Sequence, residues 1–128
     1  MKINDPAILA EVEAAFAEYE RALTTNDVET LDRLFRDAPE TLRYGTAENL
    51  YGHAEIAAFR AGRSPAGLMR KLERTRITTY GDDFATANTL FRRDGMTGKI
   101  GRQSQSWVRF AEGWRVVAAH VSVIAEPL

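Results

Sequence analysis

The chain has 128 residues, with 17 lysines and arginines against 18 acidic residues, and it contains no cysteine. This length predicts a single domain over 1–128. The balanced charge argues against a nucleic-acid-binding surface, and the lack of cysteine excludes disulfides and thiolate metal sites. No secretory signal and no apolar run of membrane-spanning length is visible, so the sequence predicts a cytoplasmic protein without membrane contact.

The first third of the sequence predicts two helices. Asp5 and Pro6 form a start signal, because aspartate caps free amides and proline suits the first helical turn. Asp27 caps a second, shorter helix that ends before Pro39. Apolar residues follow each start signal at helical spacing. They are Ile8, Leu9, Val12, Ala15, Phe16, Tyr19 and Leu23 in the first helix, and Val28, Leu31, Leu34 and Phe35 in the second.

Residues 41–63 predict a strand over 41–46, a tight connection and a third helix over 53–63. Three arginines and two tyrosines stand among apolar residues in this segment, and these are Arg43, Tyr44, Tyr51, Arg60 and Arg63. Guanidinium groups beside aromatic rings favour a pocket for a small anion, because their fork matches a carboxylate. The alternative is a set of surface arginines whose stems lie on apolar neighbours.

The apolar period changes to two after residue 70, which predicts a sheet. Strands are expected over 71–80, 84–93, 99–110 and 114–125, separated by short turns that contain glycine. Consecutive strands joined by short turns form an antiparallel meander. Three helices followed by a long sheet predict an α+β fold with the helices on one face of the sheet.

This order of elements resembles the nuclear-transport-factor-2-like, or SnoaL-like, superfamily. The resemblance implies a cone, in which a curled and mainly antiparallel sheet wraps the N-terminal helices and leaves a pocket at its open end. The ending Gly113-Trp114-Arg115-Val116-Val117-Ala118-Ala119-His120-Val121-Ser122 is similar to the last strand of many such proteins.

A narrower resemblance covers almost the whole chain. It is carried by Phe16-x-x-Tyr19-Glu20-x-Ala22-Leu23, Asn26-Asp27, Leu31-x-x-Leu34-Phe35, Arg43-x-Gly45, Gly52-x-x-x-Ile56-x-x-Phe59-Arg60 and Gly101-Arg102-x-Ser104-Gln105-x-Trp107. This pattern is similar to the AtzH/HpxZ-like family, whose members accompany amidase-signature hydrolases in the breakdown of cyanuric acid, other s-triazines and oxalurate. The resemblance implies a cofactor-free decarboxylating hydrolysis of 1,3-dicarboxyurea to allophanate, with Tyr19 and Arg43 as the catalytic residues.

The substrate that the resemblance implies is a small, planar, doubly anionic urea. Arg43 could hold a carboxylate or the developing oxyanion, and Tyr19 could donate a proton or orient a water. The alternative for Tyr19 is a core aromatic residue whose hydroxyl only reaches the edge of the pocket.

Four further residues are candidates for substrate binding. Arg60 and Arg63 lie nearly one helical turn apart and could form a second carboxylate clamp, or else stand at a solvated helix end. Gln105 could bond the urea group from an inward strand face that it shares with Gln103 and Trp107, or it could be a strand-edge amide. His120 could line the pocket or be a hydrogen-bonded core residue. No metal site is expected, because the two histidines lack ligand spacing and there is no thiol.

Two classes of function remain open from the sequence. The first is the enzyme just described, and the second is a non-catalytic accessory or ligand-binding subunit of an amidase-family partner. A homodimer is expected in either case, because outward-facing β-branched and aromatic residues of the last strands would otherwise leave an apolar patch exposed.

Overall fold

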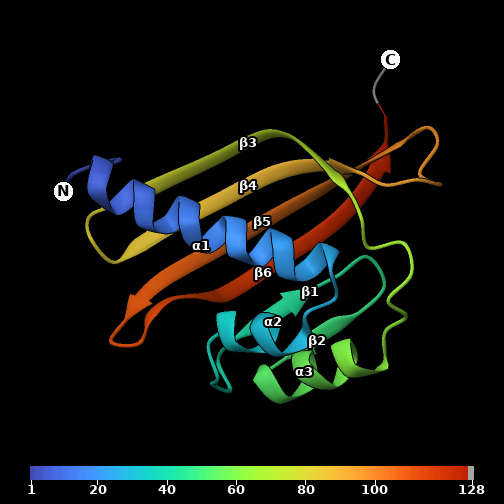
Figure 1. Ribbon diagram of the computed structural model, residues 1–128, viewed down its shortest axis with the longest axis horizontal. Helices are drawn as coiled ribbons and strands as arrows, with labels where there is room; N and C mark the ends of the chain where they lie inside the picture. The colour runs from blue at the N-terminus through green and yellow to red at the C-terminus, as the bar shows by residue number, and fades with distance from the viewer. Residues whose placement is uncertain (127–128) are drawn as a thin grey trace.

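The computed structural model describes residues 1–126, which form three helices and one six-stranded sheet (Figure 1). The helices are α1 (Pro6–Thr24), α2 (Val28–Leu34) and α3 (His53–Gly62). The strands are β1 (Leu42–Tyr44), β2 (Asn49–Tyr51), β3 (Lys71–Tyr80), β4 (Phe84–Arg92), β5 (Lys99–Phe110) and β6 (Gly113–Ala125). The predicted α+β class and the antiparallel meander are confirmed.

The sheet has the strand order β2-β1-β6-β5-β4-β3, and only the pairing of β1 with β6 is parallel. Strand β2 was not predicted from the sequence. The segment expected to be one strand and a tight connection is a short hairpin, closed by a hydrogen bond from the Gly45 amide to the Glu48 carbonyl at 2.9 Å. Two bulges, in β3 at residues 74–75 and in β6 at Val117, bend the strands and help the sheet to curl.

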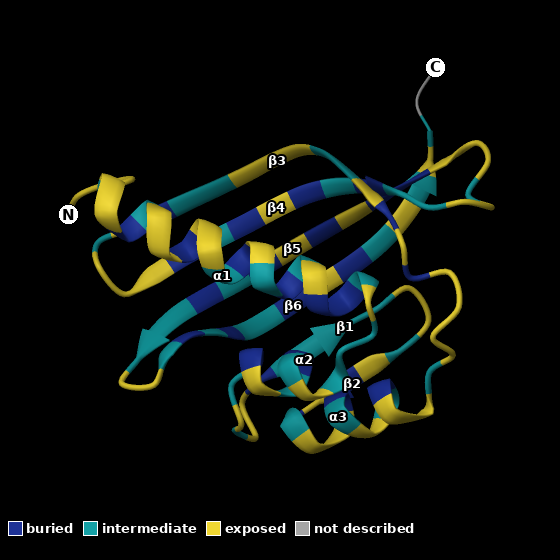
Figure 2. Ribbon diagram, viewed as in Figure 1, coloured by how far each residue is buried: buried dark blue, intermediate teal, exposed yellow. Residues whose placement is uncertain are grey.

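Helix α1 lies along one face of the sheet, while α2 and α3 gather beside β1 and β2 (Figure 1). The Asp5 carboxylate accepts hydrogen bonds from the amides of Ala7 and Ile8, so the predicted helix start is confirmed. The buried stripe of α1 turns toward the sheet (Figure 2). It packs with Leu31, Phe35, Ile56, Trp107 and Val116 into one core.

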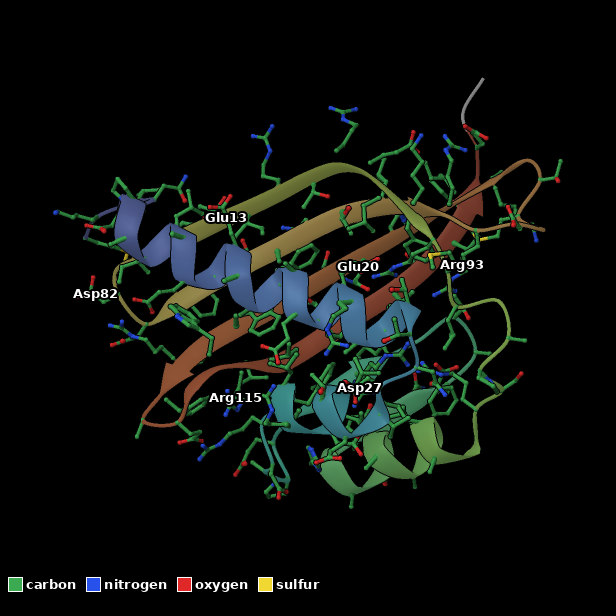
Figure 3. The ribbon with its side chains drawn as sticks, in the orientation of Figure 1. Glu13, Glu20, Asp27, Asp82, Arg93 and Arg115 are labelled. Atoms are coloured by element: carbon green, nitrogen blue, oxygen red, sulfur yellow. The ribbon has the colours of Figure 1, made fainter. Side chains whose placement is uncertain are left out.

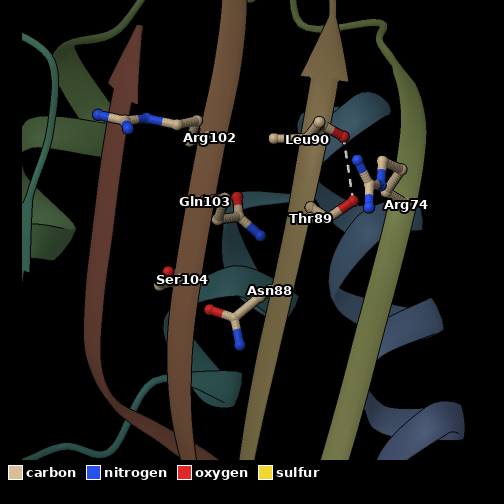
Figure 4. A pocket seen from close by; sticks show the side chains of 7 residues that line it. All are labelled: Arg74, Asn88, Thr89, Leu90, Arg102, Gln103 and Ser104. Carbon is tan, nitrogen blue, oxygen red and sulfur yellow. Dashed lines mark hydrogen bonds between the residues drawn. The ribbon is translucent and has the colours of Figure 1, made fainter.

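The opposite face of the sheet is more polar than the sequence indicated. An open groove lies between β3, β4 and β5 on this face, and Figure 4 shows the side chains that line it, with α1 behind the strands. Its side chains include Arg74, Asn88, Arg102 and Ser104. The homodimer, which was expected from the outward-facing residues of the last strands, stays a prediction.

No helix within residues 1–126 combines the length and the apolar character needed to cross a membrane.

Candidate functional site

A cavity of about 240 Å³ lies where the end of α1 meets the open end of the curled sheet. It is smaller than the ~300–1,000 Å³ typical of pockets for drug-sized ligands, which suits a compact ligand. Residues from α1, α3, four strands and three connections reach it. The lining residues are Tyr19, Leu23, Arg43, Thr46, Glu48, Phe59, Arg63, Leu68, Arg70, Phe91, Arg93, Gln103, Val121 and Val123.

Tyr19 enters the cavity from the last turns of α1. Its side chain belongs to the buried stripe of the helix and is only 4% exposed. Its ring lies against Phe35, with 6.2 Å between the ring centroids. The hydroxyl group has no hydrogen-bond partner among residues 1–126, so it is free to act on a ligand in the cavity.

Arg43 enters from the middle of β1, where β2 and β6 hold its backbone on both sides. Its Nη1 donates a hydrogen bond to Glu48 Oε1 at 2.8 Å, across the β1–β2 hairpin. Its guanidinium carbon lies 5.7 Å from the centroid of the Phe59 ring. The structure thus places the two predicted catalytic residues, Tyr19 and Arg43, in the lining of one cavity.

Arg70 is a buried cation that was not among the predicted site residues. Its Nε and Nη2 donate to the two carboxylate oxygens of Glu20, at 2.9 and 2.6 Å. Nη2 also donates to Gln103 Oε1 at 3.0 Å, which fixes the orientation of the amide. Gln103 Nε2 therefore points away from Arg70, and this buried donor has no acceptor among residues 1–126.

Arg63 and Arg93 bring further donors to the cavity. Arg63 directly follows α3, and Arg93 directly follows β4. Figure 3 labels Arg93 near the C-terminal end of α1. Nε and Nη2 of Arg63 and Nε of Arg93 are buried without an acceptor in the described part of the chain. An unpaired buried donor is costly, so these groups favour a ligand that supplies acceptors.

Burial and neighbouring charge weaken the hold of both guanidiniums on their protons. Burial lowers the pKa of Arg63, and the positive charge of Arg43 lowers it further. Burial likewise lowers the pKa of Arg93, with the charge of Arg70 as the second cause. Arginine nevertheless stays protonated near neutral pH, because its ordinary pKa lies far above it. A bound anion would offset both effects.

Three predicted binding residues lie away from the cavity. Arg60, expected to face the same way as Arg63, is buried against α2, where Nη1 donates to Asp32 Oδ1 at 3.2 Å and the guanidinium lies 4.3 Å from the Phe35 ring centroid. Arg63 instead reaches the cavity, because it follows the end of α3 and its backbone is extended. Gln105 is buried as predicted, but its Oε1 accepts from Trp107 Nε1 at 3.0 Å and the residue does not line the cavity.

His120 lies on the outer face of the sheet, not inside the cone. The extra residue of the β6 bulge, Val117, shifts the alternation, so Val116 and Val121 point inward while His120 is exposed. Its ring packs edge-on against Tyr44, with 5.9 Å between the centroids. Across residues 1–126, no cluster of three or more histidine, cysteine or acidic side chains is arranged to hold a metal ion.

The sequence contained a signal for the missed arginines. Arg70 immediately precedes one predicted strand and Arg93 ends the next, and the ends of an antiparallel hairpin lie together. In the structure, the neighbouring pair Lys71 and Arg92 is in register, which brings both arginines to the same end of the sheet. Gln103 was noticed on the inward face, but only the structure shows that it, rather than Gln105, reaches the cavity.

Phe91 supports two of these arginines, and a glycine makes room for its ring. The guanidinium carbons of Arg70 and Arg93 lie 4.8 and 4.9 Å from the Phe91 ring centroid. A Cβ atom at Gly101 would lie 2.2 Å from the ring. The ring position therefore depends on the absence of a side chain at residue 101.

We expect Gly101→Ala to destabilise the protein by about 1–3 kcal/mol, because the added methyl group forces the Phe91 ring to move. Gly62→Ala is the matched control, since a methyl group added there would meet no atom within 4 Å. Urea unfolding followed by tryptophan fluorescence measures both. Equal stability of the two variants would contradict the tight packing of Phe91 on Gly101.

Comparison with known proteins identifies the relatives of this chain. A family model described as AtzH-like matches residues 1–127. The chain belongs to the AtzH-like family. The resemblance found in the sequence is thereby confirmed at the level of the family. A comparison with curated proteins gave no match.

Two similar crystal structures extend the AtzH-like framework over nearly the whole chain. One is a Pectobacterium atrosepticum protein of the DUF3225 family, described as having unknown function, with 58% identity, 96% and 95% coverage of the two chains and a TM-score of 0.94. The other is a cystatin-like fold protein from Burkholderia xenovorans, with 52% identity, 99% coverage of both chains and a TM-score of 0.94.

A more distant structure bears on the fold alone. It is a nuclear transport factor 2-like superfamily protein from Salmonella enterica, with 24% identity, 95% and 94% coverage of the two chains and a TM-score of 0.74. The cone architecture predicted for this AtzH-like chain is confirmed.

Proposed function

We propose that this AtzH-like protein is a decarboxylating amidohydrolase that converts 1,3-dicarboxyurea into allophanate in cyanuric acid and s-triazine catabolism. Family membership supports the reaction class. The observation that carries the proposal is the surplus of buried donors around Tyr19 and Arg43, from Arg63, Arg93 and Gln103. These groups need a ligand that consists mainly of acceptors, and a dicarboxylated urea has two carboxylates and a carbonyl.

In the proposed reaction, the bond between a urea nitrogen and its carboxylate carbon breaks. The electron pair stays on the nitrogen, which takes a proton from the Tyr19 hydroxyl, and the carboxylate carbon leaves as carbon dioxide. Arg43 stabilises the negative charge that develops on the urea oxygen. Water returns a proton to Tyr19, and its hydroxide combines with the carbon dioxide to give bicarbonate. One dianion and one water thus yield allophanate and bicarbonate.

Two features make Tyr19 suited to a proton transfer. Its ring packs against Phe35, which in turn lies against the guanidinium of Arg60. Its hydroxyl, with no partner of its own among residues 1–126, can donate to a ligand without first breaking a protein hydrogen bond. Arg60 therefore supports the position of Tyr19 from outside the cavity.

The direct test is turnover by the purified protein with no metal or nucleotide added. We expect 1,3-dicarboxyurea to disappear and allophanate to form in equal amounts, as followed by carbon-13 NMR. An accessory subunit, the alternative function, would leave the substrate unchanged and bind an amidase-family hydrolase. An inactive protein that co-purifies with such a hydrolase would therefore replace the proposal.

A further inference from the structure

The four arginines of the cavity fall into two classes. Arg43 is paired with Glu48 at 2.8 Å, and Arg70 is paired with Glu20 at 2.6 Å. Arg63 and Arg93 have no carboxylate within ion-pair distance among residues 1–126. The four arginines around the cavity therefore carry an excess of two positive charges, which Arg63 and Arg93 contribute.

The two unpaired arginines line the same cavity. Arg63 is brought there by the end of α3 and Arg93 by the end of β4, where Phe91 holds its guanidinium at 4.9 Å. The charge of Arg93 adds to the lowering of the Arg63 pKa, after the larger effects of burial and Arg43. The two guanidiniums are thus within electrostatic reach of each other. Between them they leave three buried nitrogen donors, Nε and Nη2 of Arg63 and Nε of Arg93, without an acceptor in the described chain.

We propose that Arg63 and Arg93 form a subsite for the carboxylate that does not react, and that this subsite makes the cavity select dianions over monoanions. This inference rests on the proposed function, in which the reacting carboxylate lies beside Tyr19 and Arg43. A dianion compensates both excess charges, whereas a monoanion compensates only one. Because turnover removes one carboxylate, the product allophanate binds less tightly than the substrate and is released.

Glutarate and its monoamide, glutaramate, separate this charge effect from shape. Glutarate places three atoms between its carboxylates, as 1,3-dicarboxyurea does, and the monoamide replaces one carboxylate with a neutral group of similar size. Isothermal titration calorimetry near neutral pH gives the ratio of the two affinities. For the wild-type protein we expect a preference for glutarate of roughly ten- to a hundredfold, the range of one or two charge-assisted hydrogen bonds.

Replacement of either unpaired arginine should reduce this preference. We expect Arg63→Gln and Arg93→Gln each to lower the ratio by about tenfold, and the lysine variants to retain part of it because the charge remains. Arg76→Gln is the control, since Arg76 is exposed on β3 and does not line the cavity. Circular dichroism checks that each variant is folded.

Equal binding of glutarate and glutaramate by the wild-type protein would overturn the subsite without any variant. An undiminished preference in both glutamine variants would overturn it as well. Turnover of 1,3-dicarboxyurea that depends on Tyr19 would leave the proposed function standing in either case. A preference that depends on Arg63 and Arg93, found in a protein without turnover, would instead support the subsite and reject the reaction.

Discussion

Tyr19→Phe is expected to lower kcat for 1,3-dicarboxyurea by about 100- to 1,000-fold, the usual cost of losing one oriented donor at a developing charge. The substitution keeps the ring, which packs on Phe35, and removes only the hydroxyl. Since this hydroxyl has no partner within residues 1–126, its loss leaves no protein group unsatisfied. We therefore expect wild-type stability in thermal unfolding, with the loss confined to the rate.

Tyr80→Phe is the matched control for this experiment. Tyr80 lies at the end of β3, is 38% exposed and does not line the candidate cavity, so the same atomic change there should leave the rate unaltered. Full activity of Tyr19→Phe would end the role of proton donor and leave Tyr19 as a packing residue. Loss of glutarate binding together with the rate would show that the hydroxyl binds the ligand instead.

Arg43→Lys is expected to lower kcat/KM by a similar factor, about 100- to 1,000-fold. Lysine keeps the positive charge and the attraction to Glu48. It lacks the planar guanidinium, which can donate to both oxygens of a carboxylate at once. Steady-state kinetics separates the two roles of this residue. A fall in kcat indicates stabilisation of the transition state, whereas a rise in KM alone indicates uniform binding of the substrate.

Arg21→Lys provides the control for Arg43. Arg21 also donates to a carboxylate, Asp27 Oδ2 at 3.1 Å, but its side chain is largely exposed and away from the cavity. Kinetics unchanged from wild type are expected for this variant. If Arg43→Lys is as active as Arg21→Lys, two-point recognition by Arg43 plays no part in the reaction.

The paired and unpaired arginines explain how so much positive charge is tolerated in a small cavity. Glu20 and Glu48 each neutralise one guanidinium, while Phe91 offers its ring face to both Arg70 and Arg93. Contacts of cations with aromatic faces are favourable and strengthen when water is removed. Two of the four guanidiniums, those of Arg63 and Arg93, thus remain available to a ligand, while Arg43 and Arg70 are neutralised by the protein.

The amino-acid sequence by itself determined the elements that rest on local signals. Asp5 and Pro6 set the start of α1, because capping and the first helical turn involve only neighbouring residues. The period-two pattern located β3 and β5 with the predicted bounds, and it located β4 and β6 to within a residue. The sequence motifs also indicated Tyr19 and Arg43, which the structure places in one cavity.

Tertiary structure decided the features that depend on contacts between distant residues. Strand β2 is only three residues long and pairs with β1, which itself pairs with the distant β6, so its local sequence shows no strand pattern. One extra residue at Val117 moves His120 to the outer face, since side chains alternate strictly along a strand. The end of α3 separates Arg60 from Arg63, and the β3–β4 pairing brings Arg70 and Arg93 to the cavity, because strand register and helix termini fix which charges meet.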